Sequence, residues 1–174
     1  VETVEDPGIV NPRDAIVKVT SSAICGMDMH IYEGRVPAMS AGDILGHEFM
    51  GEVVEVGPAS TLRRGQRVVV PSLIACGCCH HCAMQRYSAC ENGNPPEYQD
   101  ISQALYGLPG AARFGHGRIA GGYSGGQAEY VRVPFSDVGP VEVPEGVDDD
   151  RWLPLADTLP AGWQAAECAA IEQG

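Results

Sequence analysis

The sequence predicts a mainly β fold, namely an antiparallel, barrel-like domain with few helices. The 22 glycines and 13 prolines, set against an aromatic content of 6%, favour short strands joined by turns over a helix bundle. Segments rich in β-branched residues also recur at uneven spacing, with little helical periodicity between them. With 174 residues, 44% of them hydrophobic, the chain can bury the core of one domain.

Five segments are predicted to be strands. In chain order they are residues 14–20, 49–56, 67–70, 127–133 and 138–143. In the first, Ala15, Val17 and Val19 alternate on one face, as a strand requires. The other four are each followed directly by proline or by a Gly-Pro pair, which interrupts strand pairing.

One helix is predicted near the end of the chain, over residues 157–173. Asp157 or Thr158 can cap its start, and Pro160 fits its first turn, where a missing backbone N–H does no harm. Cys168 falls in the middle of this helix and is predicted to be a core residue.

Residues 92–126 are predicted to form a long loop. They have weak periodicity and many glycines and prolines, and a loop of this length in a compact domain is usually functional or mobile. Within it, Gly115, Gly117 and Ala120 match G-x-G-x-x-A, a variant of the dinucleotide-binding fingerprint. That fingerprint needs a strand before it and a helix after it, and neither is predicted here. The segment is therefore expected to be a flexible loop bordering an active site.

Charge and hydropathy exclude several classes of partner. A formal charge of −12 makes nucleic acid and anionic membranes poor partners, because their phosphates would be repelled. No apolar run approaches the ~20 residues that cross a bilayer, and no signal peptide is visible, so a cytoplasmic location is expected. The chain starts at Val1 without an initiator methionine and stops at Gly174, so it is expected to be part of a longer protein.

Four of the seven cysteines have the spacing C-x2-C-x2-C-x7-C. They are Cys76, Cys79, Cys82 and Cys90. Four thiolates complete a tetrahedral zinc shell and leave no place for substrate, so residues 76–90 are predicted to form a structural zinc lobe. Cys78 makes the register slightly ambiguous, although only the chosen set keeps regular gaps. Free thiols, disulfides and competition from His80 or His81 are the alternatives, but an odd, clustered set of cysteines argues against disulfides.

A second group of potential metal ligands lies nearer the start of the chain. Cys25 occurs in A-I-C-G-M-D-M-H, after the first predicted strand, and His47 and Glu48 occur in G-H-E, just before the second. Alone, each is a weak signal, because an isolated cysteine is usually a small core residue and an isolated histidine a satisfied polar group. Their combination with a four-cysteine lobe is much more specific.

With these features the sequence resembles the zinc-dependent medium-chain alcohol dehydrogenases over nearly its whole length. It is most similar to the formaldehyde dehydrogenase-like branch, through G-G-Y-S-G-G-Q-A-E-Y-V-R-V-P at residues 121–134 and L-A-D-T-L-P-A-G-W at residues 155–163. The resemblance implies that residues 1–174 are the GroES-like catalytic domain. It also implies that Cys25, His47 and Asp157 hold a catalytic zinc ion.

Three protein ligands would leave one zinc position for water or substrate. The resemblance then implies hydride transfer between an alcohol or small aldehyde and NAD or NADP, with zinc as the Lewis acid. Glu48 is expected beside the zinc, as a supporting carboxylate or transient ligand. The alternative for Asp157 is an ordinary helix N-cap.

One position departs from the family pattern. The family usually has serine or threonine two residues after the zinc cysteine, and its hydroxyl passes the alcohol proton outward; here that residue is Met27. His30 matches a histidine further along the same relay. The proton is therefore expected to leave through water to His30 or Asp28, or turnover is impaired. An ordinary surface histidine is the alternative for His30.

The resemblance sets further expectations and leaves rivals open. It implies two zinc ions per chain, a Rossmann domain for NAD(P) that would follow residue 174, and a homo-oligomer at full length. The rivals are a non-catalytic module that keeps only the four-cysteine zinc, a lyase or dismutase with tightly held NAD on the same scaffold, and a zinc-ribbon nucleic-acid binder. The last needs clustered basic residues, and the lobe has little beyond Arg86.

Overall fold

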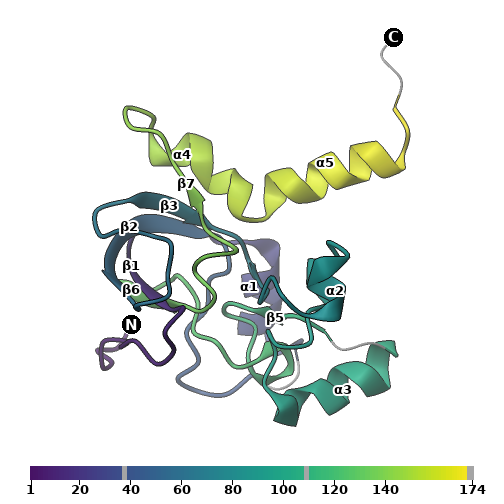
Figure 1. The fold of residues 1–174 in the computed structure, drawn as a ribbon. Helices are drawn as coiled ribbons and strands as arrows, with labels where there is room; N and C mark the ends of the chain where they lie inside the picture. Colours follow the sequence, from purple (N-terminus) through teal and green to yellow (C-terminus); the bar gives the residue numbers. More distant parts are fainter. Residues whose placement is uncertain (37–38, 108–109, 172–174) are drawn as a thin grey trace.

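The computed structural model describes residues 1–36, 39–107 and 110–171. The fold is mainly β, as predicted, with an antiparallel five-stranded sheet in the order β6-β1-β2-β3-β7. Figure 1 shows this sheet on one side of the molecule and the loops and short helices around α1, α2 and α3 on the other. The strands of the sheet are β1 (Ala15–Ser22), β2 (Phe49–Val56), β3 (Arg67–Val70), β6 (Tyr130–Val133) and β7 (Val141–Glu142).

A strand is present in each of the five predicted segments, and β2 and β3 have the predicted bounds, whereas β7 covers only two of the six predicted residues, 138–143. β6 begins three residues later than predicted, at Tyr130. The reason is that Gln127 donates its backbone N–H to the carbonyl of Leu45, at 2.9 Å, and so pairs with the loop before β2. The chain there leaves the edge of β1 and turns toward residues 44–46.

The prediction of one uninterrupted loop over residues 92–126 is wrong, because it contains helix α3 (Pro96–Tyr106). Pro96 is the first residue of the helix, where proline is tolerated, and Gly107 ends it with a φ of 70°. The prolines and glycine that indicated a loop are thus the boundaries of a helix. The predicted elements also omit α1 (Gly26–Tyr32) and the two-stranded sheet of β4 (Leu73–Ile74) and β5 (Ala112–Arg113).

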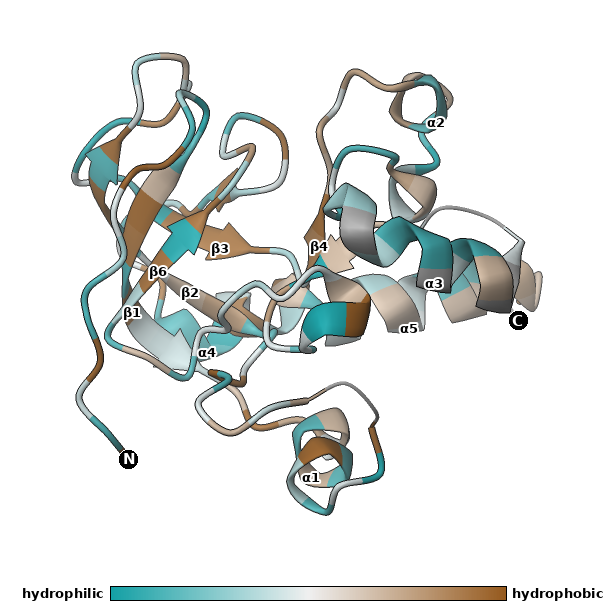
Figure 2. Cartoon of the chain, turned by 90° about the horizontal axis from the view of Figure 1, so that it is seen from below, coloured by the Kyte–Doolittle hydropathy of each residue, from teal (hydrophilic) through white to brown (hydrophobic). Residues whose placement is uncertain are grey.

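The remaining elements are short. They are α2 (His80–Ala83), η1 (Tyr87–Ala89), η2 (Arg118–Ala120), α4 (Asp149–Trp152) and η3 (Leu153–Ala156). The main core lies between the two sheets, where the rings of Phe49 and Phe114 meet edge to face with centroids 5.2 Å apart. Figure 2 shows hydrophobic residues along β2 and β3, whereas α3 is largely hydrophilic.

The predicted C-terminal helix is present as α5 (Thr158–Cys168), with Asp157 at the N-cap position. It ends before Ala170, whose φ of 47° is left-handed; the last two residues of the predicted helix, 172 and 173, lie outside the described part of the chain. No residue of α5 is buried, so the prediction that Cys168 belongs to the core is wrong. The helix extends away from the sheet and has no layer packed over it (Figure 1). None of the helices in the described residues is long and apolar enough to cross a bilayer.

Candidate metal centres

The pairing of β1 with β2 brings Cys25 and His47 together. The antiparallel register places Ser22 opposite Phe49, so the residues just after β1 lie beside those just before β2. A hydrogen bond of 2.9 Å from the N–H of Ala23 to the carbonyl of Glu48 extends this pairing. As a result, potential ligand atoms of Cys25, His47 and Glu48 lie within 4.8 Å of one another.

Both nitrogens of the His47 ring face carboxylates. The ring is 2% exposed, with Nδ1 at 3.6 Å from Oδ1 of Asp28 and Nε2 at 3.6 Å from Oδ2 of Asp157. Asp28 is also buried, and its Oδ2 accepts a hydrogen bond of 2.9 Å from the N–H of Cys25. Asp28 therefore lies beside both residues of the group, bonded to the backbone of the cysteine and facing the ring of the histidine.

Two hydroxyl groups bind the carboxylates of Glu48 and Asp157 at this centre. Thr158 Oγ1 donates to Glu48 Oε1 at 3.0 Å, and Ser72 Oγ donates to Asp157 Oδ1 at 2.9 Å. Asp157 occupies the N-cap position of α5, but its side chain makes no capping hydrogen bond. Its carboxylate approaches His47 without belonging to the compact group of Cys25, His47 and Glu48.

Gly125 and Gly126 let the segment before β6 approach His47 closely. The N–H of Gly126 bonds the carbonyl of Gly46 at 2.7 Å. A Cβ on Gly125 would lie 2.2 Å from the carbonyl oxygen of Leu45, and one on Gly126 would lie 2.3 Å from the ring of Phe49. This close approach explains why the G-G-Q sequence is needed there: it fixes the backbone that carries His47.

The four cysteines of the predicted lobe form a second compact group. Ligand sulfurs of Cys76, Cys79, Cys82 and Cys90 lie within 4.8 Å of one another. All seven cysteines are free thiols, and these four have exposed fractions of 8% or less. Cys78 is exposed and outside the group, with its sulfur 3.7 Å from that of Cys76, so the four-sulfur group has the composition that the predicted register requires. His80 and His81 also lie outside the group.

The backbone of the lobe stabilises a thiolate. Burial raises the pKa of the Cys76 thiol, but hydrogen bonds from the N–H groups of Cys78 and Cys79 outweigh it and lower that pKa to about 6. Burial raises the pKa of Cys82 to about 12. A partly ionised, closely packed set of four thiols has the donor chemistry of a tetrahedral zinc site.

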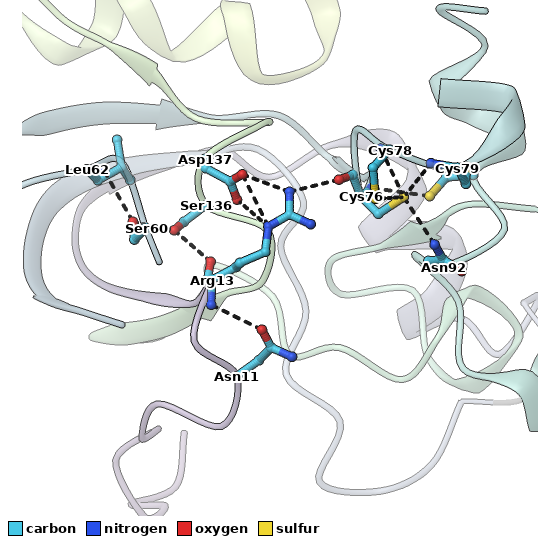
Figure 3. A network of polar contacts seen from close by, with 11 residues as sticks. Asn11, Arg13, Ser60, Leu62, Cys76, Cys78, Cys79, Asn92, Ser136 and Asp137 are labelled. Carbon is cyan, nitrogen blue, oxygen red and sulfur yellow. Dashed lines mark hydrogen bonds and ion pairs between the residues drawn. The ribbon is translucent and has the colours of Figure 1, made fainter. Parts of the chain in front are cut away.

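Arg13 joins the lobe to the sheet, as Figure 3 shows. Its guanidinium donates to the carbonyl of Cys76 at 2.8 Å and to Oδ1 of Asp137 at 2.9 Å. Ser136 Oγ donates to the carbonyl of Arg13 at 2.8 Å, and Asn92 Nδ2 donates to the sulfur of Cys76 at 3.4 Å. The Arg13 side chain thus links the Cys76 carbonyl in the lobe to Asp137, which follows β6.

Met27, which replaces the family's relay hydroxyl, and the predicted proton acceptors Asp28 and His30 all lie on α1. Met27 is 39% exposed, and His30 is exposed in the last turn of the helix. Among the described residues, no hydrogen bond or ion pair connects the His30 side chain to Cys25, His47 or Glu48. Asp28, in contrast, faces His47 directly. The structure therefore brings Asp28 rather than His30 to this centre.

His116 is a residue near this centre that the sequence did not single out. Its ring is 9% exposed and meets the His47 ring edge to face, with centroids 4.7 Å apart. Its Nδ1 is 2.8 Å from the carbonyl of Phe114, and burial lowers its pKa. The only signal in the sequence was its position inside the glycine pattern of residues 115–120, where Gly115 packs against Gly46.

The chain belongs to the alcohol dehydrogenase GroES-like domain family, which residues 11–144 match. It is 40% identical to the zinc-type alcohol dehydrogenase-like protein AdhB of Bacillus subtilis, over 100% of this chain and 44% of the relative. It is 37% identical to the glutathione-independent formaldehyde dehydrogenase of Pseudomonas aeruginosa, over 91% of this chain and 38% of the relative.

Solved structures agree with this family membership. Alcohol dehydrogenase TADH from Thermus sp. ATN1 superimposes with a TM-score of 0.84 and 32% identity, over 99% of this chain and 45% of that chain. The chain thus spans less than half the length of each of these three proteins. Its similarity to them concerns the domain that carries the two groups of potential metal ligands.

Proposed function

We propose that this domain is the catalytic part of a zinc-dependent oxidoreductase that transfers hydride between an alcohol or small aldehyde and NAD or NADP. The convergence of Cys25 and His47 with two carboxylates is the main support, since sulfur, nitrogen and oxygen donors are the set that catalytic zinc accepts. When bound, zinc would polarise the alcohol or carbonyl oxygen. Membership of a dehydrogenase family supports the same reaction class.

The proposed ligands are Cys25, His47 and Asp157, with Glu48 in support. Ligand atoms bound at about 2.0–2.2 Å lie about 3.3–3.6 Å apart in a tetrahedral shell. The 3.6 Å between His47 Nε2 and Asp157 Oδ2 fits that spacing. Asp28 faces the opposite ring nitrogen of His47 at 3.6 Å, and Thr158 donates a hydrogen bond to Glu48. Because Met27 has no hydroxyl, the alcohol proton would pass to water and then to Asp28 or His30.

The four-cysteine group is proposed to hold a second, structural zinc ion. All four of its donors would be used, so it would stabilise the lobe and take no part in the reaction. NAD or NADP would bind outside the described residues, in the manner of a Rossmann domain. The substrate would be a small molecule, and the full-length protein would be a cytoplasmic homo-oligomer.

Metal content and turnover test the proposal together. The full-length protein is expected to contain two zinc ions per chain and to reduce NAD or NADP with primary alcohols, measured by absorbance at the nicotinamide band. Cys25→Ser is expected to lose one zinc ion and the activity, whereas Cys168→Ser, at an exposed thiol, should lose neither. One zinc ion per chain in the unmodified protein, with no turnover of alcohols or aldehydes, would instead support a module that keeps only the structural zinc.

A further inference from the structure

Ser72 is a buried residue whose backbone N–H and carbonyl are both held by hydrogen bonds. It lies between β3 and β4 and is 5% exposed. Its N–H donates to the carbonyl of Ala156 at 3.0 Å, and its own carbonyl accepts the N–H of Phe114 at 3.2 Å. These two hydrogen bonds fix the Ser72 backbone against the end of η3 and the residue after β5, and so limit where its hydroxyl can lie.

That hydroxyl is directed at one oxygen of Asp157. Ser72 Oγ donates to Oδ1 at 2.9 Å, while Oδ2 of the same carboxylate lies 3.6 Å from His47 Nε2. The Asp157 side chain is 34% exposed, so without this bond it could turn toward solvent. A hydrogen bond that holds Oδ1 limits that rotation and leaves Oδ2 pointing at His47, before any metal binds.

Glu48 provides an internal comparison. Its Oε1 accepts a hydrogen bond of 3.0 Å from Thr158, so Glu48 and Asp157 each have their own hydroxyl donor. Thr158 is exposed and begins α5, whereas Ser72 is buried and fixed in the strand region. Asp157 therefore accepts its hydrogen bond from the buried donor, and Glu48 accepts its hydrogen bond from the exposed one.

We propose that Ser72 is a positioning residue that presents Asp157, rather than Glu48, to the catalytic metal as its third protein ligand. The inference rests on the proposed function, because it assumes a metal held by Cys25 and His47. Outer hydrogen-bond partners of metal ligands contribute about 10–100-fold to metal affinity, so the effect of losing the hydroxyl is measurable.

The test compares Ser72→Ala, Ser72→Thr and Thr158→Val in the full-length protein. Affinity for Zn²⁺ is measured by competition with a chelator, and the ligand field by the visible absorption of Co²⁺ bound in place of zinc. Ser72→Ala is expected to weaken binding at the catalytic centre about 10–100-fold and to alter the Co²⁺ spectrum. Ser72→Thr, which keeps a hydroxyl, should restore most of the affinity, and Thr158→Val should weaken binding less than Ser72→Ala.

Retention of the four-cysteine zinc and an unchanged circular dichroism spectrum identify folded variants. Unchanged Co²⁺ spectrum and affinity in Ser72→Ala would overturn the inference, as would a larger loss in Thr158→Val, which would make Glu48 the third ligand. Failure of the proposed function looks different: the unmodified protein would then bind metal only at the four cysteines.

Discussion

At the scale of single residues, the two neighbouring cysteines Cys78 and Cys79 have opposite roles. Cys79 belongs to the compact group of four sulfurs, whereas Cys78 is exposed and outside it. Cys79→Ser is expected to remove one zinc ion per chain and to lower the melting temperature, because a structural metal adds its binding energy to folding. Cys78→Ser should retain that zinc. Equal zinc loss in both variants, measured by elemental analysis, would mean that the ligand register differs.

Met27 allows a direct test of the proton route. A hydroxyl two residues after Cys25 would restore the relay residue of the family, so Met27→Ser is expected to raise kcat about tenfold or more and to shift the pH–rate profile. Met29→Ser is the matched control, since Met29 is an exposed methionine of the same helix. The comparison uses the alcohol oxidised fastest by the unmodified protein. Identical profiles for Met27→Ser and the unmodified protein would place position 27 outside the relay.

At the scale of elements, Asp149 attaches α4 to two strands. Its carboxylate accepts hydrogen bonds from Thr20, at 2.5 Å, and Ser21, at 3.0 Å, and forms an ion pair with Arg67. Burial acts to raise the pKa of Asp149, but the bonds from Thr20, Arg67 and Ser21 outweigh it and lower that pKa. A carboxylate with a lowered folded-state pKa stabilises the fold above its unfolded pKa of about 4, and this contribution is lost as pH falls further.

Asp149→Asn is therefore expected to lower the free energy of unfolding by about 1 kcal/mol at neutral pH. The difference from the unmodified protein should shrink as the pH falls below about 4. Urea unfolding at several pH values measures it, and Asp150→Asn, at an exposed neighbouring carboxylate, is the control. A difference that is independent of pH would show that the Asp149 charge contributes nothing.

Two glycines, one in the loop before β6 and one in α5, should respond to alanine in opposite ways. Gly126→Ala would push a methyl group into the buried ring of Phe49, so we expect a loss of about 3 kcal/mol or more. Gly162 lies inside α5 with open space around it, and Gly162→Ala should stabilise the helix by up to about 1 kcal/mol. Thermal unfolding distinguishes the expected loss of stability in Gly126→Ala from the expected gain in Gly162→Ala. Tolerance of Gly126→Ala would mean that the backbone near His47 can move.

At the scale of the whole molecule, the features that the sequence predicted correctly are those set by residues close together along the chain. β2 and β3 were found to the residue because β-branched runs end at Gly57 and Pro71. α3 was missed because its boundary residues, Pro96 and Gly107, also occur in loops. The four-cysteine group was predictable from spacing alone. The contacts of Ser72 and His116 were not, because they depend on pairing between segments more than 40 residues apart.

The exposed helix α5 also determines how stability is distributed over the molecule. An eleven-residue helix with no buried side chain lacks the packing that stabilises most protein helices, and alone it is marginal in water. In the 174-residue chain its amide protons should therefore exchange with solvent far faster than those of β1 and β2, which open only with the core. Because Asp157 and Thr158 stand at its start, their hydrogen bonds to Ser72 and Glu48 would hold the first turn against local unfolding while the far end frays.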